Sequence, residues 1–338
     1  CPPLPLLRDH WSRLYRMSSR RYIAQLVERE QIDQVFLVAD KQLRANRQGN
    51  YYLQLRLADK TGSITGMLWN ANEKIYGSFE NGNYLRVQGS TQLHNGILQM
   101  IVTRIDQVDP SGVDETDFQT INSAQIDKLA ARLAQMLRGV NNFHLRNLAE
   151  CFLVDESFMG KFTTAPAGVK NHHAYRGGLL EHVVSLMELC SVVAPRYPEI
   201  DPELLLLGAF LHDMGKIDEL TYERDLGYSD EGQLIGHVVM AVSMVEEKAK
   251  QAAKLSGEEF PSELLLRLKH MIVSHHGEYE FGSPKLPMTL EAIALHYLDN
   301  LDAKIYSAGQ ILKEDVNSDS PWTSFNAAMG RKFFKGKM

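Results

Sequence analysis

Residues 201–216 read Asp-Pro-Glu-Leu-Leu-Leu-Leu-Gly-Ala-Phe-Leu-His-Asp-Met-Gly-Lys, and this stretch is the most informative one for the fold of the larger part of the chain. Asp201 and Pro202 are the cap and first residue that typically start a helix. The apolar run after them predicts a buried helix that ends in the charged pair His212-Asp213. Such a pair at the end of an apolar helix is expensive to bury unless it binds a ligand.

Histidine and aspartate residues recur on both sides of this stretch, within or at the end of predicted helices. Each one alone has an ordinary explanation, because most buried polar side chains are simply hydrogen-bonded to the protein. The informative feature is their order along an all-helical region, with the last two aspartates one helical turn apart. The residues concerned are His182, His237, His275, His276, Asp299 and Asp302.

This ordered set resembles the HD superfamily of metal-dependent phosphohydrolases, in the variant with extra histidines that can hold two metals. The resemblance covers about residues 165–307 and implies that Asp213 bridges two ions. The first ion would be held by His182, His212, Asp213 and Asp299, and the second by Asp213, His237, His275 and His276. Imidazole nitrogen and carboxylate oxygen suit manganese, iron, cobalt, nickel or zinc.

The candidate catalytic residues are Asp213 and Lys216, which the resemblance implies, together with His172 and His173. Two neighbouring cations lower the pKa of a shared water and so supply a hydroxide nucleophile at neutral pH. Lys216 matches a lysine that follows the motif in many family members, and it could contact a phosphate oxygen. His172 and His173 are not standard ligands, and near the pocket they could bind the scissile phosphate or the leaving group.

Two alternatives stay open within this site. If only one metal binds, the histidines of the second set become phosphate contacts or general acids. Asp302 rivals Asp299 as a ligand, although the Asp-x-x-Asp-Ala pattern places the family's ligand at the first aspartate. Asp302 would then orient a histidine ligand without binding the metal itself. His270 and His296 are interpreted as structural.

The N-terminal part of the chain shows a different pattern, in which short alternating segments are separated by turn residues. Five strands are expected near residues 35–38, 51–57, 64–69, 84–89 and 97–102, with a short helix between the third and the fourth. Five strands with one helix after the third is the layout of an OB-fold barrel. Linking sequences such as Asp59-Lys60-Thr61-Gly62 resemble the OB modules of nucleases and tRNA-binding proteins.

A barrel of this kind binds single-stranded nucleic acid through cations for the phosphates and flat side chains for the bases. The alternative is that the tryptophan and alternate tyrosines belong to the barrel core. The candidate nucleic-acid contacts are Arg44, Arg47, Tyr52, Arg56, Trp69 and Arg86.

The charge of the chain is unevenly distributed between its two parts. The 338 residues carry 36 Lys+Arg and 42 Asp+Glu, which gives a net charge of −6 and excludes a wholly basic nucleic-acid binder. Residues 1–110 nevertheless hold 14 Lys+Arg against 10 Asp+Glu, whereas residues 111–338 hold 22 against 32. Nine of the twelve histidines lie between His172 and His296. This distribution predicts different tasks for the two parts.

Other features of the sequence indicate the cellular compartment in which the protein is expected. Three widely spaced cysteines form neither a disulfide framework nor a zinc ribbon, which indicates a reducing, cytoplasmic setting. No run of 18 apolar residues is present, so no membrane span is expected. Residues 1–16 lack the features of a signal peptide, and Met17 resembles a natural start.

The predicted organisation is therefore multidomain, with an N-terminal all-β OB-fold barrel followed by an all-α HD-domain helical bundle. We expect an extension (1–17), the barrel (18–108), a linker with packing helices (109–164), the HD domain (165–310) and a C-terminal tail (311–338). The tail carries aromatic and basic residues, and its aromatics are expected to dock on the domain.

Residues 18–307 as a whole resemble the bacterial YhaM-type 3′→5′ exoribonucleases. The resemblance implies stepwise hydrolysis of single-stranded RNA, or also single-stranded DNA, to 5′-mononucleotides, with manganese as the favoured metal. The resemblance does not decide whether the chain forms a homo-oligomer. The alternatives are an HD-type phosphodiesterase or nucleotidase acting on a small nucleotide, with a regulatory OB domain, and a non-catalytic nucleic-acid binder whose metal is structural.

Overall fold

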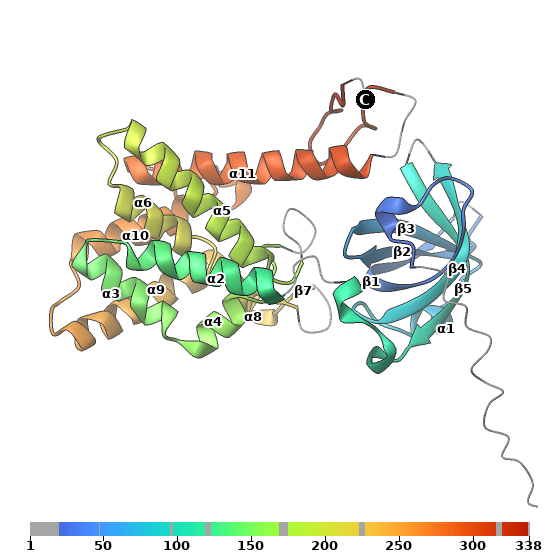
Figure 1. Cartoon of the computed structure of the whole chain (residues 1–338), viewed down its shortest axis with the longest axis horizontal. Coiled ribbons are helices and arrows are strands. Elements are labelled where there is room, and N and C mark those ends of the chain that lie inside the picture. Colours follow the sequence, from blue (N-terminus) through green and yellow to red (C-terminus); the bar gives the residue numbers. More distant parts are fainter. Residues whose placement is uncertain are drawn as a thin grey trace, which may run out of the picture.

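The computed structural model describes residues 20–46, 48–94, 97–118, 123–168, 175–222, 227–315 and 320–336. A closed barrel and a helical domain make up most of these residues (Figure 1). This arrangement confirms the predicted fold class, an OB-fold barrel followed by a helical HD domain.

The barrel has the strand order β1-β2-β3-β5-β4 and closes through antiparallel pairing of β4 with β1. The short helix α1 (Glu73–Tyr76) lies between the third and fourth strands, as predicted. β3 and β5 pair in parallel, and the other neighbours are antiparallel. The strands are β1 (Gln31–Ala45), β2 (Tyr51–Asp59), β3 (Gly62–Trp69), β4 (Tyr84–His94) and β5 (Ile97–Val108).

The first strand is longer than the sequence pattern indicated. The polar stretch Lys41–Ala45, expected to follow a short strand, continues β1 because it pairs with β2. Lys41 is buried within this stretch, and its Nζ donates to the carbonyl of Tyr76 at 2.8 Å and pairs with Glu80 at 2.8 Å. A lysine can be buried in a strand when its ammonium group has hydrogen-bond and ion-pair partners. The alternating pattern of the sequence alone does not predict a buried lysine at this position.

The helical domain is built around one apolar core. Helices α2, α3 and α4 lie in the region predicted as a linker with packing helices, and they contribute Leu133, Leu148, Phe152 and Phe162 to this core. The helices are α2 (Ser123–Arg138), α3 (Phe143–Leu153), α4 (Glu156–Phe162), α5 (Gly178–Val193), α6 (Pro202–Leu211), α7 (Lys216–Glu219), α8 (Asp230–Leu234), α9 (His237–Ser256), α10 (Ser262–Ser274) and α11 (Leu290–Glu314), and a two-stranded ribbon pairs β6 (Leu220–Thr221) with β7 (Gly227–Tyr228).

The sequence signals for the central helix are confirmed in detail. Asp201 caps α6 by accepting hydrogen bonds from the amides of Glu203 and Leu204, and Pro202 is its first residue. The segment Gly178–Arg196 is long and apolar enough to cross a membrane, but 56% of it is buried inside the structure. Because α5 packs against α2, α6 and α11, its apolarity is accounted for by its place in the core.

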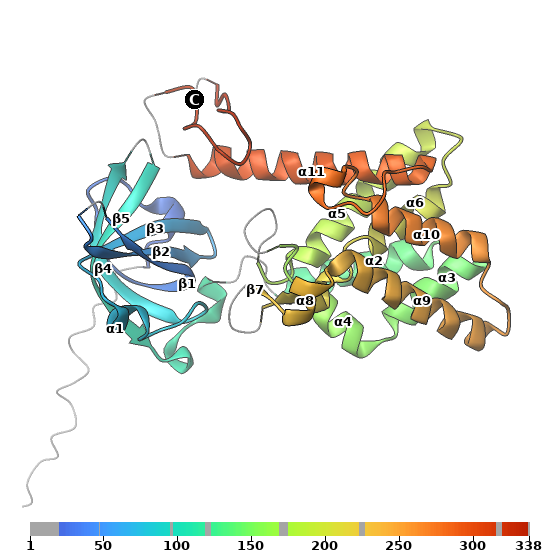
Figure 2. The same cartoon turned by 180° about the vertical axis from the view of Figure 1, so that it is seen from behind.

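The long helix α11 packs along the helical domain and extends beyond it. It begins on the helical domain and runs toward the barrel, and the C-terminal segment lies at its far end (Figures 1 and 2). The inner side of α11 packs against α5, α6 and α10. This packing brings aspartates from the end of the sequence onto the helices that carry the histidines.

Candidate metal centre and nucleic-acid interface

Three helices bring the first group of site residues together. His182 lies within α5, His212 caps the end of α6 and Asp213 follows it, so the buried helix pair delivers three polar groups to one point. Nε2 of His182 lies 3.4 Å from Nε2 of His212 and 3.2 Å from Oδ1 of Asp299 on α11. Oδ2 of Asp213 is 3.3 Å from Nε2 of His212. Both imidazoles are fully buried.

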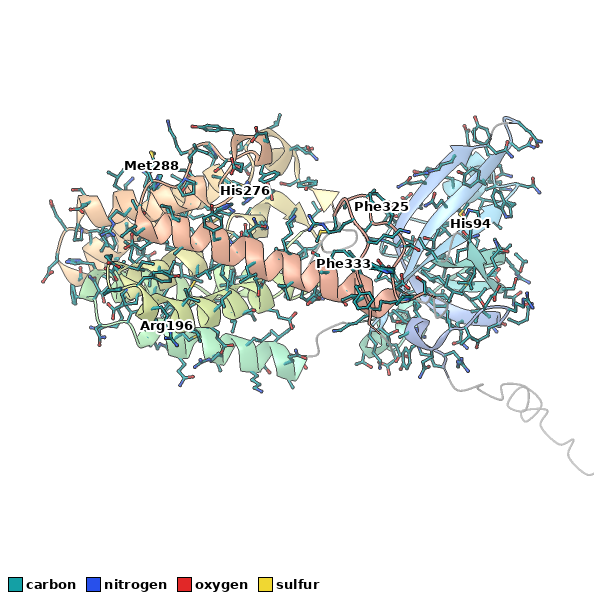
Figure 3. The ribbon with its side chains drawn as sticks, turned by 90° about the horizontal axis from the view of Figure 1, so that it is seen from above. His94, Arg196, His276, Met288, Phe325 and Phe333 are labelled. Atoms are coloured by element: carbon teal, nitrogen blue, oxygen red, sulfur yellow. The ribbon has the colours of Figure 1, made fainter. Side chains whose placement is uncertain are left out.

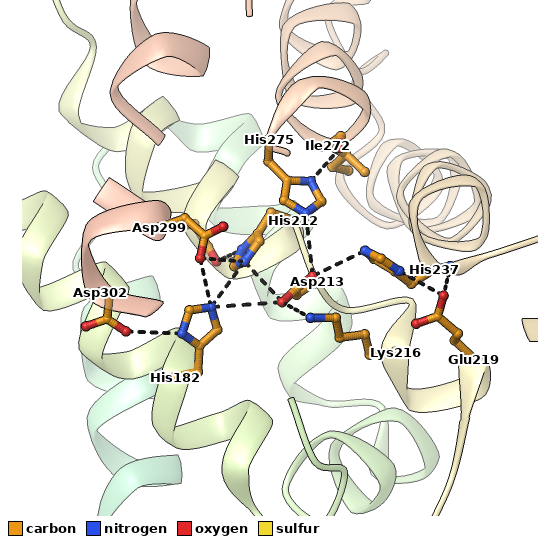
Figure 4. Close-up of polar contacts among 11 residues, drawn as sticks. His182, His212, Asp213, Lys216, Glu219, His237, Ile272, His275, Asp299 and Asp302 are labelled. Carbon is orange, nitrogen blue, oxygen red and sulfur yellow. Dashed lines mark hydrogen bonds and ion pairs between the residues drawn. The ribbon is translucent and has the colours of Figure 1, made fainter. Parts of the chain in front are cut away.

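A second group of imidazoles faces the other oxygen of the same carboxylate. His237 is the first residue of α9, and His275 and His276 follow the end of α10. Oδ1 of Asp213 lies 3.5 Å from Nε2 of His237 and 3.6 Å from Nε2 of His275. Asp213 therefore sits between the two groups, one oxygen toward each (Figure 4). The structure thus brings together all seven residues that the resemblance named as ligands.

A glycine allows the second group to approach this closely. A Cβ atom on Gly215 would lie 2.1 Å from the carbonyl oxygen of His237, so the turn after Asp213 can contact the start of α9 only without a side chain. Gly236, the cap before His237, has φ of +80°, which favours glycine. These two positions set the distance between Asp213 and His237.

Four of the imidazoles are oriented by a hydrogen bond on the nitrogen that points away from the site. Nδ1 of His212 donates to the Ala209 carbonyl at 2.8 Å, and Nδ1 of His275 donates to the Ile272 carbonyl at 2.7 Å. A carbonyl can only accept, so in the neutral form of these two rings the Nε2 atom carries the lone pair, which is directed into the site. The remaining pairs are His182 Nδ1 with Asp302 at 3.2 Å and His237 Nδ1 with Glu219 at 2.9 Å.

Asp302 and Glu219 therefore contact the histidine nitrogens that point away from the site. Asp302 contacts the outer nitrogen of His182 and also accepts from Ser185 at 2.9 Å, which matches the supporting role expected for it. Sequence reasoning missed Glu219, whose Oε1 accepts from both the amide and Nδ1 of His237, each at 2.9 Å. The available signal was an acidic residue in the short segment after the His-Asp pair.

The electrostatics of the site depend on opposed effects of burial and charge. Burial favours neutral imidazole, yet Asp299 and Asp302 outweigh it and raise the pKa of His182 to about 9. Burial and the neighbouring histidines His275 and His237 lower the pKa of His276 to about 3. Burial also lowers the pKa of His275.

Lys216 forms an ion pair with the central carboxylate. Its Nζ lies 2.6 Å from Oδ2 of Asp213. Burial would lower the pKa of Lys216, but the charge of Asp213 raises it, so the side chain stays cationic. Burial would conversely raise the pKa of Asp213, and Lys216 and His212 hold it well below the ordinary value. A lysine and an ionised aspartate thus lie at the centre of the site.

Unpaired polar atoms test whether these residues fit a metal. Oδ1 of Asp213, Nε2 of His237 and Nδ1 of His276 are buried and have no hydrogen-bond partner among the described residues. Such atoms are costly unless a ligand satisfies them. Ligand atoms of His182, His212 and Asp213 lie within 4.8 Å of one another, as do those of His237, His275 and His276. The donor set of imidazoles and carboxylates fits borderline divalent cations.

We expect Glu219→Gln to weaken metal binding by about 10–100-fold, because His237 would lose the carboxylate that orients it and raises its basicity. The affinity for manganese is measured by calorimetric titration. Glu199→Gln, which changes an exposed glutamate, is the matched control and should bind like the original protein. Equal affinity of both variants would contradict the role of Glu219.

The remaining histidine predictions have different outcomes. Nδ1 of His296 lies 2.9 Å from the His275 carbonyl, and Nε2 of His270 accepts from the Met288 amide at 2.9 Å, so both rings are bound to backbone. His172 and His173 lie outside the described residues, and their roles stay predictions.

On the barrel, several predicted contacts form a row across three strands. Arg44 pairs with Tyr52 in the β1–β2 register, and Tyr52 pairs with Trp69 in the β2–β3 register, so all three point to the outer face. Trp69 is 48% exposed, and its ring centroid lies 5.2 Å from that of Tyr52. This arrangement differs from the alternative in which Trp69 belongs to the core.

The other predicted contacts are more constrained. Arg56 lies on the same outer face, and its Nε is buried without a hydrogen-bond partner in the described part of the barrel. Arg86 is paired with Asp33 through bonds of 2.6 and 2.9 Å, so a phosphate would have to compete with that carboxylate. Arg47 lies outside the described residues.

The C-terminal segment differs from the expectation that its aromatics dock on the domain. Trp322, Phe325 and Phe334 are 48%, 61% and 59% exposed. The Trp322 and Phe334 rings pack on each other at 5.0 Å, and Lys335 pairs with Asp315 at 2.8 Å. Because the segment is held by this buried ion pair and by its own ring contact, its outer surface stays open.

Comparison with known proteins agrees with this architecture. The HD domain family matches residues 179–304, and an OB-fold nucleic acid binding domain family matches residues 37–108. The 3'-5' exoribonuclease YhaM of Bacillus velezensis is 33% identical over 90% of this chain and 95% of its own length. The Bacillus subtilis protein of that name is 34% identical with the same coverage, and the Geobacillus one 32% over 90% and 92%. The chain belongs to the YhaM family of 3'-5' exoribonucleases, as its sequence predicted.

Proposed function

We propose that this protein is a metal-dependent 3′→5′ exoribonuclease that hydrolyses single-stranded RNA to 5′-mononucleotides. The observation that carries the proposal is the position of Asp213, whose two oxygens face two separate groups of imidazoles. A carboxylate shared in this way is suited to two cations bound side by side. The relatives named 3'-5' exoribonuclease support the direction of attack and the class of substrate.

The proposed ligands fall into the two groups described above. His182, His212, Asp213 and Asp299 would hold one divalent ion, and Asp213, His237, His275 and His276 the other, with manganese favoured. Bound cations would lower the pKa of a water and offset the negative charge that develops on the phosphoryl group. Asp302 and Glu219 would orient His182 and His237 toward the ions.

Lys216 and the barrel would contribute to substrate binding. Nζ of Lys216 is charged and lies at the centre of the site, where it could donate to a phosphate oxygen. The outer face of β1–β3 offers Arg44 for a phosphate and the rings of Tyr52 and Trp69 for bases. We propose that this face grips the strand upstream while its 3′ end lies at the cations. We also propose a cytoplasmic location, because the widely spaced cysteines indicate a reducing compartment.

The test is the degradation of an RNA labelled at its 5′ end, in the presence of manganese. Stepwise shortening with release of 5′-mononucleotides is expected. A matched single-stranded DNA establishes the preference between the two nucleic acids. Parallel incubation with cyclic and alarmone nucleotides tests the alternative, in which a small nucleotide is the substrate. Turnover of a small nucleotide with no shortening of RNA would overturn the proposal.

Removing both outer rings of the barrel, by Tyr52→Ala and Trp69→Ala together, should weaken RNA binding. Base stacking on aromatic rings contributes about 1–3 kcal/mol per base, or about 2–6 kcal/mol for two rings, so we expect KM for RNA to rise at least roughly 30-fold at unchanged kcat. Steady-state kinetics on a 20-nucleotide RNA measures KM and kcat separately. Tyr197→Ala, at an exposed tyrosine of the helical domain, is the control. A fall in kcat alone would argue against a binding role.

A further inference from the structure

The outer face of α11 is apolar and uncovered in the described structure. We use this name for Leu290, Ile293, Tyr297, Leu301, Ile305 and Leu312. Their exposed fractions range from 36% for Leu312 to 67% for Ile305. At 3.6 residues per turn, these positions lie on the side of the helix opposite the metal-site residue Asp299. Figure 3 looks down on α11, which passes in front of the helical domain.

This face departs from the pattern of a surface helix. A helix on the surface of a monomer carries charged and polar residues on its solvent side. Between Leu290 and Leu312, Lys304 is the one exposed charged residue that the helical repeat places on the outer face, since Glu291 is buried. The inner face packs on the domain, with Ala292 and Leu295 fully buried and Asp299 directed into the candidate site. A helix whose inner face is packed and whose outer face is also apolar is typically covered on both sides.

We infer that a second copy of this chain covers the outer face of α11, with the two helices antiparallel about a two-fold axis at Leu301. The spacing of the exposed residues supports this occupant, because it is symmetric about that residue. Tyr297 and Ile305 lie four positions to either side of Leu301, and Leu290 and Leu312 lie eleven positions to either side. A two-fold axis needs such a self-complementary surface.

The one asymmetric position fits the same packing. Eight residues before Leu301 stands the large Ile293, and eight residues after it stands Gly309, preceded by Ala308. The two-fold operation places each isoleucine against the small residues of the other helix. Large side chains opposite small ones allow two helices to pack closely.

The size of the surface is also adequate. Six large apolar side chains that expose on the order of 100 Å² each offer about 600 Å² per copy, or about 1,200 Å² in total, which is the lower bound for a specific interface. The face spans 23 residues, which corresponds to a length of about 33 Å at 1.5 Å per residue. It therefore needs no contribution from another surface to reach the size of a stable dimer.

Mass measurement of the full-length protein by light scattering tests the dimer directly. The expected mass is twice the 38.2 kDa of the chain. Leu301→Glu places two like charges face to face at the axis and should raise the dimer dissociation constant by about 100-fold or more. Leu266→Glu, at a residue of α10 that is 65% exposed, is the matched control and should remain dimeric. Circular dichroism establishes that both variants are folded.

Cysteine cross-linking tests the geometry without relying on a disruptive variant. Cys151 and Cys190 are buried, so Cys1→Ser provides a suitable background. Under oxidation, Leu301→Cys should form a covalent dimer with itself. Leu290→Cys should not, but it should cross-link to Leu312→Cys when the two chains are mixed. A monomeric protein, or a dimer that Leu301→Glu leaves intact and Leu301→Cys does not cross-link, would overturn the inference.

Discussion

Asp213→Asn will reduce RNA hydrolysis by roughly 10³-fold or more, the largest effect expected of any single substitution. The carboxylate faces both imidazole groups, so one change removes a ligand from each proposed cation. The loss corresponds to several kcal/mol of transition-state stabilisation. The measurement is the initial rate of shortening of a labelled RNA at saturating manganese.

The substitution also leaves Lys216 without its 2.6 Å partner, so loss of folding must be separated from loss of chemistry. Thermal unfolding of the variant provides that check. His212→Gln is a second variant, which removes a ligand of the first group and keeps the Asp213–Lys216 pair. Asp127→Asn, at an exposed aspartate of α2, is the control for loss of one negative charge. Retained activity in both site variants would contradict the proposed centre.

Metal removal will abolish activity and lower thermal stability together. Each proposed ligand group loses its cation, and the buried unpaired atoms of Asp213, His237 and His276 are left unsatisfied. Manganese at 100 times its Kd should stabilise the folded state by about 2.7 kcal/mol per site, which raises Tm by roughly 5–10 °C. The measurements are activity and unfolding after treatment with a chelator and after return of the metal.

The number of ions can be obtained from the same material. Elemental analysis of the reloaded protein should give two manganese ions per chain, and His237→Ala should reduce this number to one while the first group stays loaded. One ion in both proteins would instead favour the alternative in which His237, His275 and His276 contact phosphate. Activity that survives complete removal of the metal would contradict a metal-dependent reaction.

The local sequence patterns predicted much of the fold because they depend on near neighbours. Asp201-Pro202 predicted the start of α6, and the alternating strands predicted a closed barrel. The length of β1 was not predictable, because the burial of Lys41 depends on the carbonyl of Tyr76 and the carboxylate of Glu80, which lie 35 and more positions away. Tertiary partners of this kind leave no trace in the periodicity of the strand.

The sequence by itself determined the residue types of the candidate site, since the order of histidines and aspartates along apolar helices carries the resemblance to the HD superfamily. The tertiary structure alone decided how they act: which oxygen of Asp213 faces which group, and that Glu219 orients His237. It also decided that one face of α11 is left uncovered by the described residues of the same chain. Distances and hydrogen bonds between helices depend on how the whole core packs, and close packing is a property of all its residues together.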